Sequence, residues 1–313
     1  YGITKYAAER YVHLTAARRD LDFAFTPTSF RMFNVYGVRQ SLTNAWGVTM
    51  QYTHEYVAIP IDHPLKAPED LDHFVPPDPA LDPAFLSAMH RVVQRYKGKR
   101  AILASARAVF GDSWNLRGME GFLTDLALNP GLVRRITRMV AEYNAERCRQ
   151  LVRAGADIVL LGDDYAHKTA PLMSPAAFRE FILPGFRQVV AAIKAEGGYC
   201  IKHTDGNIWS IIGAIVESGV DCLGPLEPAA GMDLWWVKQR FGDRVAVLGN
   251  VDVDLLARGS VEEVRAATLS LLERVAPGGG YLLSSGNSIT SAVRPENWLA
   301  MIETARQHGR YPI

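Results

Sequence analysis

From about residue 100 onward, short apolar runs alternate with longer segments whose apolar residues recur at helical spacing. Short buried strands separated by amphipathic helices are typical of βα units, in which crossover helices join parallel strands. The pattern predicts six strands, at 101–110, 157–164, 199–205, 221–227, 244–250 and 280–287. Regular alternation over this length favours an α/β (β/α)8 TIM barrel. A doubly wound open sheet is the alternative, but no GxGxxG motif follows a strand.

Upstream of these units the pattern is less regular. Residues 21–29 predict a further strand, residues 48–60 an extended hairpin, and the proline-rich stretch 64–83 an ordered surface connection. We therefore expect one barrel domain over residues 1–313, with an N-terminal extension (about 1–95) that packs on the barrel or completes it.

Composition excludes several classes of protein. The chain carries 34 basic and 33 acidic residues, so it lacks the basic surplus of most nucleic-acid-binding proteins. No apolar run approaches the ~20 residues that a membrane helix needs. The three cysteines lack CxxC spacing and are odd in number, which favours the reducing cytoplasm over a disulfide framework.

The most informative segment is YCIKHTDGN, at 199–207, where an apolar strand ends in polar residues. Residues i and i+2 of a strand share a face, so His203 and Asp205 point toward one spot. An imidazole and a carboxylate in this arrangement suit a metal such as zinc, or an acid–base pair. A histidine oriented by an aspartate for structural reasons is the alternative.

Other strands also end in polar groups. These are Arg107, Asp163 and Asp164, Glu227, Asn250 and Asp252, and Ser285 and Asn287. In a barrel such ends form the active face, although some groups, Asp252 and Asp254 among them, are expected only to cap helices. Asp163 and Asp164 are adjacent carboxylates, which repel unless a cation or hydrogen-bond donors compensate. A role for at least one of them is expected, and the pattern does not decide which.

The segment after this pair offers one more candidate ligand. Residues 174–196 predict a helix with Ser174 as N-cap and Pro175 at its first position, kinked or split at Pro184. Glu180 on this helix could reach inward, or it could belong to a solvated face. Trp114, in FGDSWNLRG, is expected in a loop on the active face, as a pocket wall.

Motifs along nearly the whole chain resemble the uroporphyrinogen decarboxylase superfamily of (β/α)8 barrels. They are WG at 46–47, HPL at 63–65, PPDP at 76–79, LRG at 116–118, MSPAAFREFILP at 173–184, HTDGN at 203–207, LGN at 248–250 and PEN at 295–297. The superfamily includes the decarboxylase of haem biosynthesis and zinc-dependent methyltransferases that work with corrinoid proteins.

Specific residues favour the methyltransferase branch. The arginine-rich RQAGRY-type segment of the decarboxylase is absent, and Arg31 and Arg39 are the only arginines in FRMFNVYGVRQ. The thiol-specific methyltransferases carry HxC and a later cysteine as zinc ligands. Here Asp205 replaces the first cysteine, and the region of the second reads SSGNSI, around Asn287. Oxygen ligands make a harder site than thiolates do.

The resemblance implies transfer of a methyl group from a small methylated substrate, a methyl ether such as a methoxylated aromatic or a methylamine, to a Co(I) corrinoid. The sequence has no DxHxxG-type cobalamin segment, so a partner protein is expected to supply the corrinoid. Zinc ligands are expected among His203, Asp205, Asp164 and Glu180. Asp164, His203, Asp205 and Asn250 are the expected catalytic residues, and Trp114, Arg107, Glu227 and Asn287 the expected substrate contacts.

Two other functions stay open. One is a metal-free decarboxylase or lyase that uses the same pocket. The other is a non-catalytic tetrapyrrole- or corrinoid-binding barrel in which the loss of cysteines marks a decayed site. Formation of a homodimer is also left open.

Overall fold

Six parallel strands form the centre of the molecule in a computed structural model that describes residues 41–52 and 58–311. They are β4 (Leu103–Arg107), β5 (Ile158–Gly162), β6 (Tyr199–Thr204), β7 (Cys222–Pro225), β8 (Ala246–Val251) and β9 (Tyr281–Ser285). Each strand pairs in parallel with the next along the chain, in the order β4-β5-β6-β7-β8-β9. The six βα units predicted after residue 100 are therefore confirmed.

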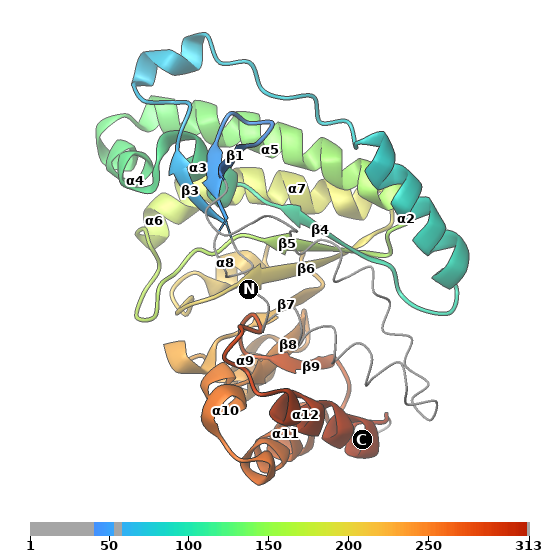
Figure 1. The fold of residues 1–313 in the computed structure, drawn as a ribbon. Coiled ribbons are helices and arrows are strands. Elements are labelled where there is room, and N and C mark those ends of the chain that lie inside the picture. The colour runs from blue at the N-terminus through green and yellow to red at the C-terminus, as the bar shows by residue number, and fades with distance from the viewer. Residues whose placement is uncertain (1–40, 53–57, 312–313) are drawn as a thin grey trace.

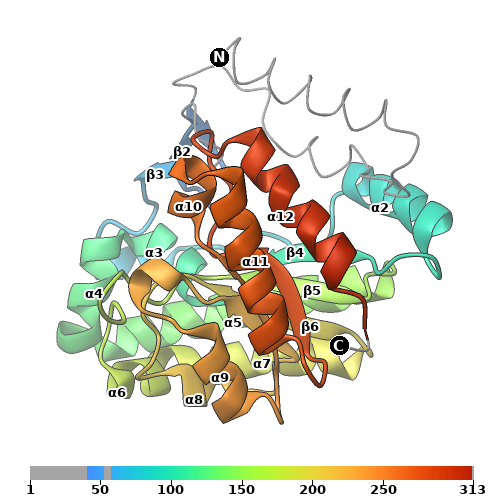
Figure 2. The same ribbon diagram turned by 90° about the horizontal axis from the view of Figure 1, so that it is seen from below.

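Helices follow every strand. They are α3 (Phe110–Arg117), α4 (Met119–Leu128) and α5 (Pro130–Arg153) after β4; α6 (Pro175–Ala177), the π-helix η3 (Phe178–Ile182) and α7 (Leu183–Ala195) after β5; α8 (Ile212–Val216) after β6; the 3-10 helix η4 (Pro228–Ala230) and α9 (Leu234–Phe241) after β7; α10 (Val253–Arg258) and α11 (Val261–Val275) after β8; and α12 (Pro295–His308) after β9. Figures 1 and 2 show α5 and α7 side by side at one end of the sheet and α11 and α12 together at the other.

Apolar burial holds α5 and α7 against the sheet. Both helices are amphipathic, and Val140 and Ala141 of α5 are fully buried together with Phe186 and Val189 of α7. Val140, Phe186 and Val189 each contribute roughly 1.5 to 3 kcal/mol on burial. A Cβ atom on Gly185 would lie 2.8 Å from that of Ala141, so the close approach of the helices depends on this glycine.

The strand alternation separates two faces of the sheet. In β6, the Lys202 ammonium lies 5.8 Å from the ring centroid of Phe186 in α7, so Lys202 faces the helices. His203 is next along the strand and therefore faces the opposite side. Its register partners are Gly162 in β5 and Gly224 in β7. A Cβ atom on Gly162 would meet only the Ala106 backbone oxygen, at 3.9 Å, so the β5 side of the imidazole is open, whereas Leu248 already fills the space at Gly224.

The N-terminal part of the described chain is a small antiparallel sheet of β1 (Ser41–Thr43), β2 (Thr49–Gln51) and β3 (Ile59–Asp62), in that order. The antiparallel pairing of β2 with β3 confirms the extended hairpin. The 3-10 helix η2 (Pro68–Asp72) and α2 (Pro83–Tyr96) lead from it to β4. Within the described ranges the parallel sheet has six strands, and the strand predicted at 21–29 lies outside those ranges, as do Arg31 and Arg39.

One local prediction is wrong, and another is confirmed. Trp114 lies in helix α3 and packs against the core, not in a loop. The segment after Ser174 does begin with this residue as N-cap, accepting from the Ala177 N–H at 3.1 Å. It then widens into the π-helix η3 just before Pro184, because a proline has no N–H to continue regular α-helical bonding.

Among the described residues, no helix is long and apolar enough to cross a membrane.

Candidate active site

The two adjacent aspartates after β5 have separate environments. Asp163 points to the helix side and is buried, and its carboxylate accepts backbone N–H bonds from Val109 (2.9 Å), Phe110 (2.8 Å) and Gly111 (2.5 Å). Burial raises the pKa of the Asp163 carboxyl, and the nearby Lys202 ammonium and these three donors act in the opposite direction. Asp163 therefore anchors the N-terminus of α3 to the end of β5.

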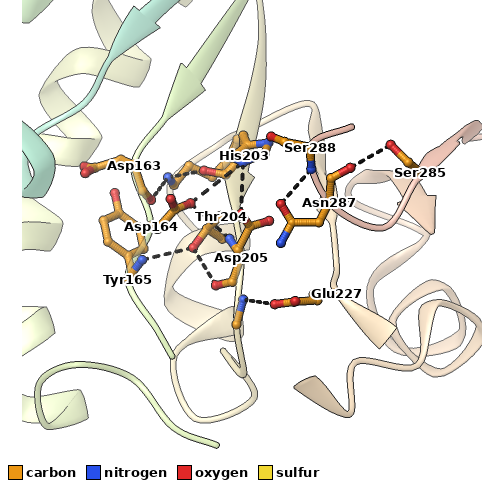
Figure 3. Close-up of polar contacts among 12 residues, drawn as sticks. Asp163, Asp164, Tyr165, His203, Thr204, Asp205, Glu227, Ser285, Asn287 and Ser288 are labelled. Atoms are coloured by element: carbon orange, nitrogen blue, oxygen red, sulfur yellow. Dashed lines mark hydrogen bonds and ion pairs between the residues drawn. The ribbon is translucent and has the colours of Figure 1, made fainter. Parts of the chain in front are cut away.

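Asp164 points to the other face, where it meets the end of β6. Nε2 of His203 lies 3.8 Å from Oδ1 of Asp164 and 3.6 Å from Oδ2 of Asp205. One possible ligand atom from each of the three residues lies within 4.8 Å of the others. Figure 3 shows the three side chains converging. The structure thus brings together three of the four residues predicted as metal ligands.

The donor set fits a divalent cation. Asp205 Oδ1 is buried and has no hydrogen-bond partner within the described part of the chain, although buried polar atoms normally have one. The imidazole nitrogen is slightly too far from either carboxylate for a hydrogen bond. Ligands on one tetrahedral zinc ion stand roughly 3.3 to 3.5 Å apart, as follows from bond lengths of about 2.0 to 2.1 Å. An ion between these side chains would satisfy Asp205 Oδ1 and needs only small movements.

Glu180, the fourth predicted ligand, lies elsewhere. It belongs to η3, and its carboxylate pairs with the guanidinium of Arg134 in α5. Both side chains are about half exposed, so this is a surface ion pair of small energetic value. The solvated-face alternative describes Glu180.

Glu227 supports the HTDGN loop. Its Oε2 accepts the backbone N–H of Gly206 at 3.1 Å. Gly206 has a φ of +78°, and a Cβ there would lie 2.6 Å from backbone atoms of Ala166. Only glycine fits this position, which explains the DG pair that follows the histidine.

Asn250 lies near the end of β8, and Asn287 follows β9. Asn250 is buried, and its Nδ2 donates to the carbonyl oxygens of Leu226 (2.6 Å) and Met232 (3.3 Å), so its amide group holds the segment after β7. Asn287 Oδ1 accepts the Ser288 N–H, and its backbone oxygen accepts from Ser285 Oγ at 2.7 Å. Figure 3 places Asn287 on the side of His203 away from Asp163.

Arg107 and Trp114 lie on the β4 side of the site. Arg107 is the last residue of β4. It pairs in register with Gly162 of β5, which in turn pairs with His203 of β6. The Arg107 side chain is half exposed. The nearest described carboxylate, that of Asp112, is 3.7 Å from its Nε. Arg107 is therefore available to a ligand, whereas Trp114 on α3 is largely taken up by core packing.

Sequence reasoning missed a buried polar group behind the site. Lys202 is fully buried, and Tyr165 beside it is also fully buried. The sequence feature that could have revealed it is a lysine inside an apolar strand. Lys202 lies two residues after apolar Cys200 and therefore shares its helix-facing side.

Comparison with known proteins agrees with this architecture. Residues 41–308 match the family model described as uroporphyrinogen decarboxylase (URO-D). The chain belongs to this family. Its relatives include the uroporphyrinogen decarboxylases of Thioalkalivibrio sulfidiphilus, 26% identical over 74% of this chain and 67% of that protein, and of Alkalilimnicola ehrlichii, 27% identical over 79% and 68%. A solved methyltransferase from Methanosarcina mazei superimposes with a TM-score of 0.71 at 20% identity, covering 88% of this chain and 80% of that one. The structural similarity to this methyltransferase, at 20% identity, shows the fold of the chain.

Proposed function

We propose that this family member is a zinc-dependent methyltransferase that passes a methyl group from a small methyl ether or methylamine to the Co(I) corrinoid of a partner protein. One observation carries the proposal. Asp164, His203 and Asp205 converge at the ends of β5 and β6, and Asp205 Oδ1 has no hydrogen-bond partner among the described residues, which suits a cation ligand.

His203, Asp205 and Asp164 are the proposed zinc ligands. When bound there, zinc supplies Lewis acidity toward the ether oxygen or amine nitrogen of the substrate, which makes this atom a better leaving group. Gly162 leaves room beside the imidazole for the substrate, because a Cβ atom there would meet no described atom closer than the Ala106 backbone oxygen at 3.9 Å. Glu227 holds the loop that carries Asp205 through the Gly206 N–H.

Arg107 is the proposed contact for the far end of the substrate. It lies two strands from His203 in the same register row, which places their backbones roughly 10 Å apart at the usual strand spacing. A guanidinium at that distance suits a carboxylate or phenolate on the ring of a methoxylated aromatic compound.

Decarboxylation is the second candidate, because the curated relatives named above are uroporphyrinogen decarboxylases. The local charge disfavours a substrate with many carboxylates. Asp164 and Asp205 place two acidic groups beside the imidazole of His203, and Glu227 adds a third at the Gly206 N–H. Among the described residues, Arg107 is the arginine at these strand ends. Like charges in such proximity repel unless a cation compensates.

Methyl transfer to free Co(I) cobalamin, followed by its absorption spectrum, tests the proposal. Zinc-loaded wild type is incubated with methoxylated aromatics and methylamines, and with uroporphyrinogen in a parallel assay for CO2. We expect methyl transfer that is lost in His203→Ala and kept in His167→Ala, whose imidazole bonds only to Thr169 among described residues. CO2 release without methyl transfer would establish the decarboxylase instead.

A further inference from the structure

Behind the carboxylate–histidine cluster, on the helix side of the sheet, lies a buried lysine. The Lys202 ammonium donates to the backbone oxygens of Asp163, at 2.5 Å, and His203, at 2.6 Å. It also stands 4.1 Å from the ring centroid of Tyr165, a cation–π distance. These contacts join the end of β5 to the end of β6 from the side opposite the candidate ligands.

The two strand ends joined in this way carry the whole cluster. One of the two carbonyl groups belongs to Asp163, the residue directly before Asp164. The other belongs to His203 itself. The register pairs of the strands stop at Gly162 and His203, so regular ladder bonding does not extend to Asp164 and Asp205. From that point on, the ends are joined by a long backbone bond from Asp163 N–H to His203 O at 3.3 Å, and by two bonds to side chains. These are Tyr165 N–H to Thr204 Oγ1 and Asp205 N–H to Asp164 Oδ1, each at 3.1 Å.

Burial of the Lys202 ammonium between two strand ends is energetically unfavourable. Lys202 is fully buried, and removing a charged group from water costs free energy. Its positive charge also opposes a cation on the other face of the sheet. Attraction of the metal therefore does not explain Lys202. Its charge compensates the buried Asp163 carboxylate, and its two hydrogen bonds fix the geometry of the two strand ends.

We propose that Lys202 is a positioning residue that holds the ends of β5 and β6 in register, so that Asp164, His203 and Asp205 face one ion. The metal part of this inference rests on the proposed function. The positioning part concerns the backbone and holds with or without a metal.

Hydrogen exchange of the metal-free protein tests the positioning part. In Lys202→Met we expect the amides of Tyr165 and Asp205 to exchange at least about tenfold faster, while amides in the middle of β5 and β6 change less. Leu272→Ala, at a buried position of α11, is the control for general destabilisation and is expected to leave the ratio of strand-end to mid-strand exchange unchanged. An unchanged ratio in Lys202→Met would overturn the proposal.

Cobalt(II) binding, followed by its visible spectrum, tests the metal part. We expect Lys202→Met to bind Co2+ about 10- to 100-fold more weakly than wild type, with an altered spectrum, as for other residues that orient ligands. Equal affinity and an identical spectrum would overturn the proposal. Absence of Co2+ binding in wild type would instead defeat the proposed function, and the exchange experiment would still decide the role of Lys202.

Lys202→Gln provides a second variant that keeps one donor without the charge. We expect it to fold and to show intermediate exchange rates and affinity. If neither variant folds, Lys202 supports the sheet as a whole, and the positioning proposal is overturned.

Discussion

The backbone N–H of Asp205 donates to Oδ1 of Asp164 at 3.1 Å, so one candidate ligand orients another across the gap between β6 and β5. The bond leaves the second oxygen of Asp164 and both oxygens of Asp205 available to an ion. Two acidic side chains are thereby held near one imidazole in an arrangement that repels itself without a cation.

The ligand assignment predicts different effects for two carboxylates. Asp205→Asn removes a charge from the cluster, so we expect its zinc affinity to fall by more than about tenfold. Glu180→Gln, on the Arg134 side of η3, is expected to leave the affinity unchanged. Competition with a chromogenic chelator measures both. A loss of affinity in Glu180→Gln alone would contradict the assignment.

Asp163 is expected to affect stability and not metal affinity. Asp163→Ala leaves three buried N–H groups of α3 without their acceptor, which costs roughly 3 to 5 kcal/mol of unfolding free energy. Asp82→Ala is the matched control, because Asp82 caps α2 with two similar bonds at an exposed site, and we expect a cost of about 1 kcal/mol. Urea denaturation compares the two. Equal costs would show that burial of the Asp163 cap adds nothing.

Arg107 is expected to select acidic methyl donors. Arg107→Met removes the guanidinium, so we expect the KM for a methoxylated aromatic acid to rise about tenfold or more, with little change for a neutral methyl ether. The variant should keep its stability, since the Arg107 side chain is half exposed and its Nε lies 3.7 Å from Asp112, which makes a weak ion pair. Steady-state kinetics with the two donors measure this. An equal rise in KM for both would assign Arg107 to general structure.

The buried cysteines predict a loss of stability at alkaline pH. Burial raises the pKa of Cys148 and of Cys222 from 9.0 to about 12. The unfolded thiols lose their protons first, so their contribution is complete below pH 9.0 and is lost as pH rises toward about 12.

Urea denaturation at about pH 8 and about pH 11 measures this loss. We expect a smaller difference between the two values in Cys148→Ala than in wild type. An identical difference in the two proteins would contradict the burial of this thiol.

Hydrophobic periodicity was sufficient for the central sheet. All six predicted strands are present, because each is an apolar run flanked by helical patterns. The strand predicted at 101–110 is shorter, since Phe110 already begins α3. That boundary depends on the distant Asp163 carboxylate accepting the first N–H groups of the helix, which local pattern does not reveal.

Local sequence pattern could also predict part of the candidate site. Two-residue periodicity placed His203 and Asp205 on one face, as the structure confirms. It did not decide between Asp163 and Asp164, which depends on where the loop after β5 turns. The pairing of Glu180 with Arg134 and the burial of Lys202 arise from packing between segments far apart in the chain, beyond the reach of a local pattern.

The most direct measurement is elemental analysis of the purified protein, for wild type and for His203→Ala, after zinc is supplied and excess removed. We expect about one zinc ion per chain in wild type, retention in His167→Ala, and loss in His203→Ala. Well-folded wild-type protein that retains no zinc or other divalent metal would contradict this expectation.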